Sequence, residues 1–214
     1  MARSDGVSPE RARELAAAAD AAGCRVVARR ELRDGEHTWP VLELECGTNA
    51  NAIRFLDGVA TLDAGDPTVR DLALRLRSVH GGELETAKAI QAFIRSAVRF
   101  VREARETFQH TLYTLRRRAG DCDDHSRAVV ALARAAGLRA SALGVPNSRG
   151  QIGHVAPMIT ADGKKWWAET TVDAHFGEHP RAAARRLGIT SRPDIWSERR
   201  AAVHSAPPAT STTR

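Results

Sequence analysis

The sequence contains few cysteines, few aromatic residues and no long hydrophobic run. Only three of its 214 residues are cysteine, and aromatic side chains make up 5% of the chain. No run of about 18 apolar residues occurs, so the sequence predicts no membrane-spanning helix and no membrane partner. The first residues also lack the apolar stretch that is typical of a signal peptide. We therefore expect the protein in the cytoplasm, or packaged in a particle that is assembled there.

The small and odd number of cysteines is not typical of a disulfide framework. Cys24 and Cys46 have apolar neighbours, and free cysteines commonly behave as small core residues. We expect these two residues to be buried free thiols rather than a bridge. Cys122 differs from them because acidic residues and a histidine surround it.

Hydrophobic residues make up 43% of the chain and charged residues 27%, which suits one or two domains with a buried core. The net charge is +6, and the pI is about 10.0. The arginines are scattered, with the densest cluster at Arg116–Arg118, and aromatic residues do not alternate with them as in a stacking platform. The charge therefore predicts a solvated basic surface, and nucleic-acid binding is the weaker hypothesis.

Helix signals recur along the chain. Ser8-Pro9 provides an N-cap and a proline for the first turn, and Gly23 provides a stop signal. Later segments have apolar residues at three- and four-residue steps, which is the pattern of a helix with one buried side. The predicted helices cover residues 9–22, 67–80, 83–103, 121–136 and 180–188.

Strand signals accompany two short turns, Asp34-Gly35 and Asp162-Gly163, which are typical of hairpins. Residues 104–119 are predicted as a loop, 47–65 have no clear pattern, and the tail from about Ala201 has too few apolar residues to predict order. The predicted strands cover residues 24–31, 38–45, 138–145, 154–159 and 165–172. We divide the chain into an N-terminal region (1–65), a core (66–188) and a C-terminal extension (189–214).

The segment Gly120-Asp121-Cys122-Asp123-Asp124-His125 marks the point where a loop becomes a helix. A cysteine in the first helical turn faces unpaired backbone N–H groups and the positive end of the helix dipole, and both favour a thiolate. Because only the thiolate attacks, the pKa of the thiol must fall below its usual value of about 8.5. The neighbouring carboxylates oppose ionisation, so a histidine or another cation is needed near the sulfur. We predict that Cys122 is a nucleophile.

His154 opens a predicted strand and is the candidate base, because a Cys–His pair is a common way to activate a thiol. Such a histidine needs a third group to orient it. If Asp162-Gly163 forms a two-residue turn, the strand register places Glu169 diagonally opposite His154. Asp173 satisfies the same alternation of faces, so Glu169 and Asp173 both remain candidates for the acid.

These segments resemble the transglutaminase-like superfamily, which includes transglutaminases, microbial cysteine proteases and peptide N-glycanases. The resemblance covers roughly residues 70–180 and rests on a cysteine at a helix start, a histidine that opens a strand, and an acid shortly after a tryptophan. These features are found in Ala119–Ser126, Gly153-His154-Val155 and Trp166–Val172. The resemblance implies an α+β fold with a papain-like core, in which a catalytic helix packs on an antiparallel sheet after helices and a hairpin. The family's acid is usually aspartate, and here Glu169 takes its place.

The resemblance also implies that the backbone N–H of Cys122 helps to stabilise an oxyanion, and Gln109 is a candidate second donor by its side-chain chemistry. His125, one turn after the cysteine, is expected to support the site or to lie on the surface. A separate interpretation is a zinc site with ligands drawn from Cys122, His125, His154, His175 and His179. Their spacing matches no zinc signature, so we expect neither a metal nor a cofactor.

Two functions follow as hypotheses. In the first, Cys122, His154 and the acid hydrolyse an amide or peptide bond of a protein or peptide substrate through a thioacyl intermediate. Acyl transfer to an amine is a related outcome. In the second, the same fold is a non-catalytic structural or binding component, for example of a phage particle, with virion proteins as partners.

Overall fold

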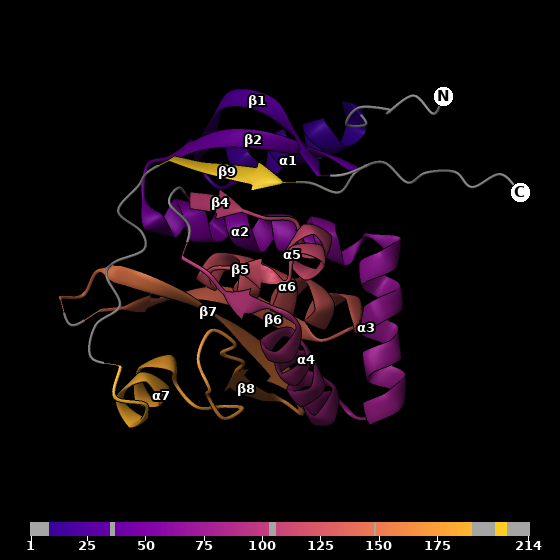
Figure 1. Cartoon of the computed structure of the whole chain (residues 1–214), viewed down its shortest axis with the longest axis vertical. Coiled ribbons are helices and arrows are strands. Elements are labelled where there is room, and N and C mark those ends of the chain that lie inside the picture. Colours follow the sequence, from indigo (N-terminus) through magenta and orange to yellow (C-terminus); the bar gives the residue numbers. More distant parts are fainter. Residues whose placement is uncertain (1–8, 35–36, 103–105, 148, 190–199, 205–214) are drawn as a thin grey trace, which may run out of the picture.

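A computed structural model describes the chain except for residues 1–8, 35–36, 103–105, 148, 190–199 and 205–214. Helix α6 (Cys122–Ala135) lies at the centre, with other helices and separate small sheets packed around it (Figure 1). The architecture is α+β, which confirms the predicted fold class. Within the described residues, no helix has both the length and the apolar character that crossing a membrane requires.

Helices and strands are mixed along the chain. The other helices are α1 (Pro9–Ala21), α2 (Asn49–Ala64), α3 (Pro67–His80), α4 (Glu83–Ala97), α5 (Thr111–Arg117) and α7 (Pro180–Arg186). The strands are β1 (Cys24–Asp34), β2 (His37–Cys46), β3 (Arg99–Phe100), β4 (Glu106–Phe108), β5 (Ala119–Gly120), β6 (Arg139–Pro146), β7 (Ile152–Ala161), β8 (Lys164–Trp167) and β9 (Arg200–His204).

The N-terminal hairpin contains a disulfide between Cys24 and Cys46, so the prediction of two free thiols is wrong. β1 and β2 pair antiparallel, and their register puts the two cysteines directly opposite each other. Their Cα atoms lie 4.2 Å apart, which is the close spacing of directly opposed residues in an antiparallel pair. Both residues are buried, as expected. The disulfide depends on the pairing register of β1 and β2, and the number of cysteines in a sequence gives no information about that register.

Residues 47–65, which have no clear pattern in the sequence, contain α2. Thr48 caps this helix by accepting a hydrogen bond from the backbone N–H of Asn51 at 3.1 Å, and Gly65 ends it. One residue in its buried stripe is charged, and that charge hides the amphipathic pattern. The buried residues of the helix are Ala52, Phe55, Leu56, Val59, Ala60 and Asp63.

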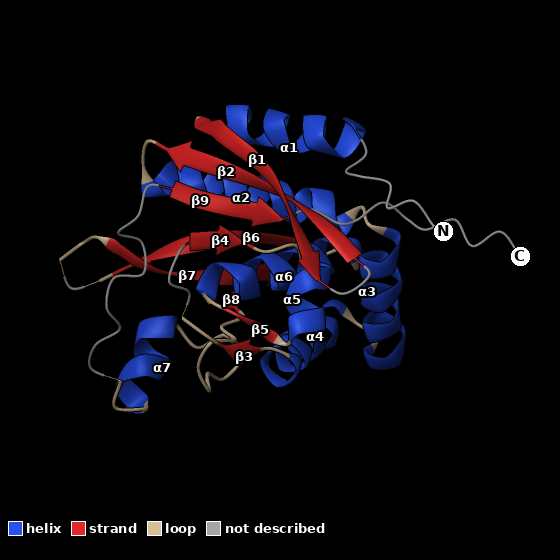
Figure 2. Cartoon of the chain, turned by 45° about the horizontal axis from the view of Figure 1, so that its top comes forward, coloured by secondary structure: helices blue, strands red, loops and turns tan. Residues whose placement is uncertain are grey.

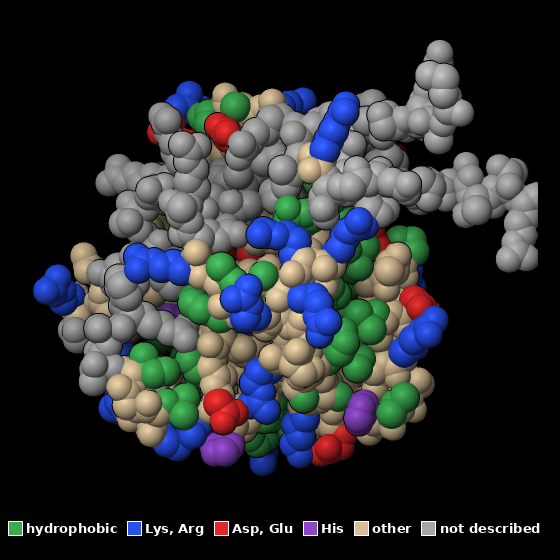
Figure 3. Space-filling view, viewed as in Figure 1, with side chains coloured by type: hydrophobic (Ala, Val, Ile, Leu, Met, Phe, Trp, Pro, Cys, Tyr) green, Lys and Arg blue, Asp and Glu red, His purple; other side chains and the backbone are tan. Residues whose placement is uncertain are grey.

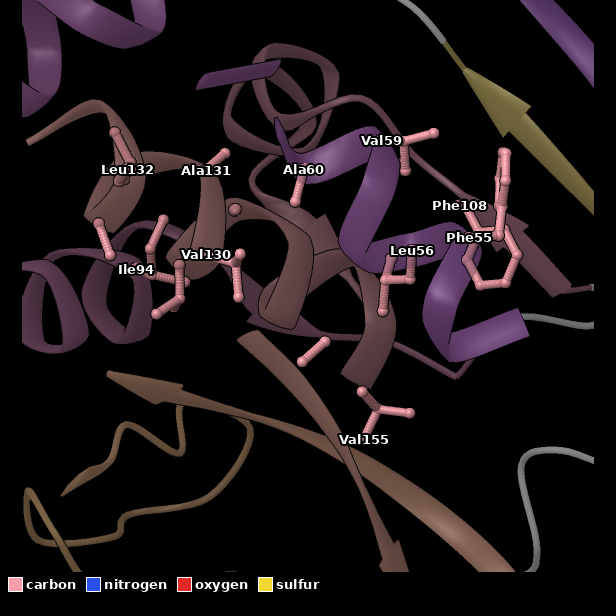
Figure 4. Close-up of a cluster of buried hydrophobic side chains, with 14 of the residues drawn as sticks. Phe55, Leu56, Val59, Ala60, Ile94, Phe108, Val130, Ala131, Leu132 and Val155 are labelled. Atoms are coloured by element: carbon pink, nitrogen blue, oxygen red, sulfur yellow. The ribbon is translucent and has the colours of Figure 1, made fainter. Parts of the chain in front are cut away.

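Helix α6 is the core of the molecule, because every residue from Cys122 to Ala133 is buried. Figure 4 shows Leu56 and Ala60 of α2 near one side of α6, while Val155 of β7 lies beneath its first turns. Burying each such aliphatic side chain contributes roughly 1.5–3 kcal/mol relative to exposure. This packing holds the helix that carries Cys122 rigidly between α2 and the β6–β8 sheet.

The predicted helix over 83–103 and the predicted loop over 104–119 both need correction. Helix α4 ends at Ala97, and Arg99–Phe100 form β3, which pairs in parallel with β5. The predicted loop contains β4, α5 and β5. The pairing depends on contacts between distant segments, such as the hydrogen bond from the backbone N–H of Arg99 to the carbonyl of Arg118 at 2.9 Å. The apolar periodicity continues past Ala97, and it therefore predicted a helix that is too long.

The order β6-β7-β8 forms an antiparallel sheet, and the predicted two-residue turn is confirmed. Ala161 pairs with Lys164, and the φ angles of Asp162 and Gly163 are 49° and 74°. These left-handed conformations are typical of a tight hairpin turn. β8 ends at Trp167, before the predicted 172, yet the N–H of Ala168 still donates to the carbonyl of Pro157 at 2.9 Å. The register of β7 and β8 therefore continues to Ala168, the residue before Glu169.

The C-terminal extension contributes β9, which includes the first residues of the tail from Ala201, a segment with too few apolar residues to be ordered alone. Residues 205–214 lie outside the described residues. β9 pairs antiparallel with β2 and parallel with β4, which gives the strand order β1-β2-β9-β4 (Figure 2). Backbone hydrogen bonds to two neighbours stabilise a strand without requiring an apolar composition.

Candidate active site

The site begins at the first turn of α6, where Cys122 is the first helical residue and is completely buried. Asp121 is the N-cap, and its side chain accepts a hydrogen bond from the backbone N–H of Asp123. The side chain of Asp124 accepts in turn from the N–H of Asp121, so the two acids form a capping box. Cys122 therefore lies at the positive end of a well-capped helix, as predicted from the loop-to-helix motif.

Asp124 also attaches the chain before α5 to this helix start. It is completely buried and accepts hydrogen bonds from the backbone N–H of Gln109 at 2.7 Å and from the Gln109 side-chain amide at 2.5 Å. Gly120 permits this arrangement, because a Cβ atom at that position would lie 2.7 Å from the Cβ of Asp124. The structure thus brings the predicted oxyanion candidate Gln109 to the same helix turn as Cys122.

His154 and Glu169 form a close pair at the beginning of β7. His154 Nε2 lies 2.5 Å from Glu169 Oε2, and the side chains are 13% and 1% exposed. Burial alone would raise the pKa of Glu169. The charge of His154 and its hydrogen bond, together with the two from Thr171, instead lower the pKa to about 2. The carboxylate is therefore ionised at neutral pH and can orient and charge-stabilise the imidazole.

The remaining contacts of Glu169 fix its conformation. Its Oε1 accepts hydrogen bonds from the backbone N–H and the hydroxyl of Thr171, at 2.6 and 2.8 Å. Its backbone carbonyl accepts one from the Gln91 side chain of α4 at 2.8 Å. Three hydrogen-bond donors besides His154 therefore hold Glu169. Its side chain is one methylene longer than that of aspartate, and these bonds fix the position of its carboxylate.

Ser126 joins the helix of Cys122 to the strand of His154. Its hydroxyl lies 2.7 Å from the carbonyl of Cys122 and 3.2 Å from the carbonyl of Val155, and both carbonyls are acceptors for it. Val155 directly follows His154 and lies beneath the first turns of α6 (Figure 4). The other ring nitrogen of His154, Nδ1, is buried and has no hydrogen-bond partner among the described residues.

Asp173, the alternative acid, lies elsewhere. Its side chain is 80% exposed and pairs with Arg95 at 2.9 Å. The two residues that satisfied the same strand alternation therefore have different surroundings, and Glu169 is the one in contact with His154.

The family model described as the transglutaminase-like superfamily matches residues 70–176, which is half of the chain. The match includes the Cys122, His154 and Glu169 segments. The chain belongs to the transglutaminase-like superfamily. No curated protein matches the sequence.

Two solved structures are similar to this transglutaminase-like chain. One is a "putative protease" from Parabacteroides distasonis, with a TM-score of 0.47 and 17% identity over 67% of this chain and 30% of its own. The other is a "putative cysteine protease" from Cytophaga hutchinsonii, with a TM-score of 0.42 and 14% identity over 70% of this chain and 66% of its own. The chain thus spans under a third of the first protein and about two thirds of the second.

His125 is buried inside the transglutaminase-like core rather than on its surface. Its Nδ1 lies 3.1 Å from the hydroxyl of Thr170, the residue after Glu169. This contact connects the first turn of α6 to the segment that carries the acid. His125 is therefore placed to support the site through Thr170, in line with one of its two expected roles.

The potential metal ligands that lie close together in this transglutaminase-like core are not the five zinc ligands considered from the sequence. Among the described residues, only Asp121, Cys122 and Asp123 bring three such atoms within 4.8 Å of one another. These atoms surround the amide-rich start of α6, whose dipole favours anions and opposes a cation. The donor arrangement therefore fits a metal ion poorly.

A buried polar cluster beside the site is not predicted by the local sequence pattern. Arg127 of α6 donates to both carboxylate oxygens of Asp63 and to the carbonyl of Phe108, at 2.7–2.8 Å. The backbone N–H and hydroxyl of Thr111 also donate to Asp63, and His110 Nε2 lies 3.1 Å from it. Asp63, at a core position of α2, was the sequence signal for this cluster, because a buried acid requires polar partners.

Proposed function

We propose that this chain is a cysteine hydrolase that cleaves an amide or peptide bond. Cys122 is the nucleophile, His154 the base and Glu169 the residue that orients the base. The observation that carries the proposal is the buried His154–Glu169 pair on a strand whose next residue is joined to Cys122 through Ser126. The family and its fold support the same chemistry.

The pair assigns a role to each ring nitrogen of His154. Nε2 is engaged with Glu169, so its proton stays there and Nδ1 is left as the basic nitrogen. Nδ1 is buried and has no hydrogen-bond partner among the described residues, which suits a group that accepts the thiol proton. The ionised Glu169 favours the imidazolium that results.

The reaction then follows the sequence of acyl transfer to a thiol. His154 takes the proton of Cys122, and the sulfur forms a bond to the substrate carbonyl carbon while the carbonyl oxygen becomes an oxyanion. When the tetrahedral intermediate collapses, the C–N bond breaks and the leaving amine takes the proton from His154. Water, deprotonated by His154, then attacks the thioester carbonyl; the C–S bond breaks, the acid is released, and the sulfur takes the proton back from His154. We propose hydrolysis rather than cross-linking because water is a sufficient acceptor for the thioester.

The oxyanion is assigned to the backbone N–H of Cys122 and to Gln109. The N–H of the first helical residue has no acceptor within its own helix. The bond from Gln109 to Asp124 uses one of its two amide hydrogens and fixes the position of the carboxamide. Pre-oriented donors of this kind stabilise developing negative charge without reorganising.

Alkylation by iodoacetamide tests the nucleophile, because Cys122 is the one free cysteine of the chain. We expect labelling at pH 7 to be faster than that of a cysteine peptide, and His154→Ala to slow it at least about tenfold. His80→Ala, which changes an exposed histidine on α3, is the matched control and keeps the wild-type rate. Amine release from a peptide anilide should disappear in Cys122→Ala.

Labelling no faster than that of the peptide, or labelling that does not respond to His154→Ala, overturns the proposal. The non-catalytic binding or structural component would then be the better account of the fold. Fast labelling with transfer to an added amine instead of hydrolysis would keep the nucleophile and change the reaction to acyl transfer.

A further inference from the structure

Three arginines lie on or next to the paired strands β3 and β5, which precede the first turn of α6. The parallel pairing of β3 with β5 brings two distant segments side by side: the N–H of Arg99 donates to the carbonyl of Arg118, and that of Val101 donates to the carbonyl of Gly120, both at 2.9 Å. Arg102 follows Val101 directly. We call Arg99, Arg102 and Arg118 the arginine rim.

The side chains of the rim are exposed and, among the described residues, have no carboxylate partner. All three residues are exposed, and within the described part of the chain none of them forms an ion pair. Some other surface arginines have a carboxylate partner, such as Arg75 with Asp71 and Arg186 with Glu178. The guanidinium groups of the rim are therefore available to an external anion.

Arg118 occupies a position that does not favour an arginine. It follows α5 with φ 54° and ψ 31°, the left-handed conformation that glycine or asparagine adopts at lower cost. A large charged side chain is present there nonetheless. The side chain of Arg118 is exposed, so packing in the core does not require an arginine at this position.

The rim borders the proposed nucleophile. Arg118 is followed by Ala119, Gly120, the N-cap Asp121 and then Cys122, and Gly120 lies against Asp124. Figure 3 shows several Lys and Arg side chains on the face over α4 and α5, with a few acidic side chains in its lower part. A peptide that lies along this face next to the start of α6 would meet positive charge.

We propose that the arginine rim recognises an acidic segment of the polypeptide substrate, an inference that rests on the proposed function for the substrate's class. Carboxylates match the planar guanidinium fork in pairs of hydrogen bonds. None of the large hydrophobic side chains exposed in the described residues is aromatic. The aromatic residue within the rim segment, Phe100, is half-buried and offers nucleic-acid bases less surface for stacking than an exposed ring would. The recognised feature is negative charge on the peptide, close to the scissile bond.

Peptide binding to the full-length Cys122→Ala protein tests the rim without requiring catalysis. The probes are a fluorescein-labelled peptide with four glutamates and the same peptide with four glutamines. We expect the acidic peptide to bind about tenfold more tightly in low salt, as three weak surface ion pairs would give. Added NaCl should reduce this preference.

The variant Arg99→Gln, Arg102→Gln, Arg118→Gln in the same background should abolish the preference. The matched control is Arg70→Gln, Arg75→Gln, Arg139→Gln, which removes the same charge from exposed sites on α3 and β6 and should keep the preference. Circular dichroism establishes that both triple variants are folded.

Equal affinity for the two peptides, or a preference that survives the rim variant, overturns the proposal. Tighter binding of a DNA duplex than of the acidic peptide, lost in the rim variant, would also overturn it and assign the rim to nucleic acid. The outcome is separable from the proposed function: slow alkylation of Cys122 with a retained acidic preference removes the hydrolase but leaves the rim as a binding surface.

Discussion

Asp63 of α2 and Arg127 of α6 are joined by two parallel hydrogen bonds of 2.8 Å, and both side chains are completely buried. Burial alone would raise the pKa of Asp63, but the charges of Arg127 and then His110 hold it well below its ordinary value. Arg127 also donates to the carbonyl of Phe108, the residue before Gln109. A helix outside the matched family region thus helps to position the chain that borders Cys122.

Breaking this pair should destabilise the fold. Asp63→Asn leaves a buried arginine without its counter-charge, which costs about 3–5 kcal/mol. Urea unfolding at pH 7 measures the loss. Asp71→Asn is the control, because its pair with Arg75 is exposed and should contribute less than about 1 kcal/mol. Similar losses in the two variants would mean that the buried pair does not stabilise the fold.

Glu169→Gln should abolish most of the activity while the protein remains folded. Glutamine keeps the size of the side chain but cannot hold the charge that stabilises the His154 imidazolium, and its amide can misorient the ring. We expect kcat to fall by about 100-fold or more. Asp173→Asn, which alters the exposed partner of Arg95, should leave kcat within about twofold. The opposite ranking would assign the orienting acid to Asp173.

Stability should fall in acid because of Glu169. Its pKa is about 2 in the folded protein against an ordinary 4.5, so the folded state favours the ionised form. The resulting stabilisation, about 3 kcal/mol by linkage, is fully present above pH 4.5 and is lost as the pH falls towards 2. Urea unfolding of the wild type and Glu169→Gln between pH 6 and 2.5 measures it. The stability difference should shrink with falling pH, and a constant difference would contradict a depressed pKa.

The disulfide should stabilise the N-terminal hairpin. Closing a loop between residues 22 apart restricts the unfolded chain, and its removal in Cys24→Ser, Cys46→Ser should cost about 3 kcal/mol. Thermal unfolding of this variant and the wild type, with and without dithiothreitol, measures the effect. Only the wild type should respond to the reductant. A native wild-type chain that titrates three thiols would show that the bond is absent.

Local sequence information was sufficient where neighbouring residues decide the structure. The capping acids around Cys122 predicted the start of α6, and the Asp162-Gly163 turn predicted the register that brings residue 169 towards His154. α3 was predicted because proline and glycine mark its two ends. Interactions within a few residues, or a turn with one preferred geometry, determine each of these features.

Long-range pairing explains what local patterns missed. β3 exists because it pairs with β5, and β9 because β2 and β4 lie on either side of it. The partners of Asp63 come from segments 48 and 64 residues away, so its charge made α2 hard to predict. Patterns within a window of a few turns contain no information about such partners.

By itself, the sequence determined the mixed helix-and-sheet class, the cysteine at a capped helix start and the alternation of side chains along β7 and β8. Only the tertiary structure decided that Glu169 rather than Asp173 contacts His154, that Cys24 meets Cys46, and that Asp63 is buried with Arg127. The reason is physical: periodicity and capping depend on neighbours along the chain, whereas a contact between distant side chains depends on how whole elements pack.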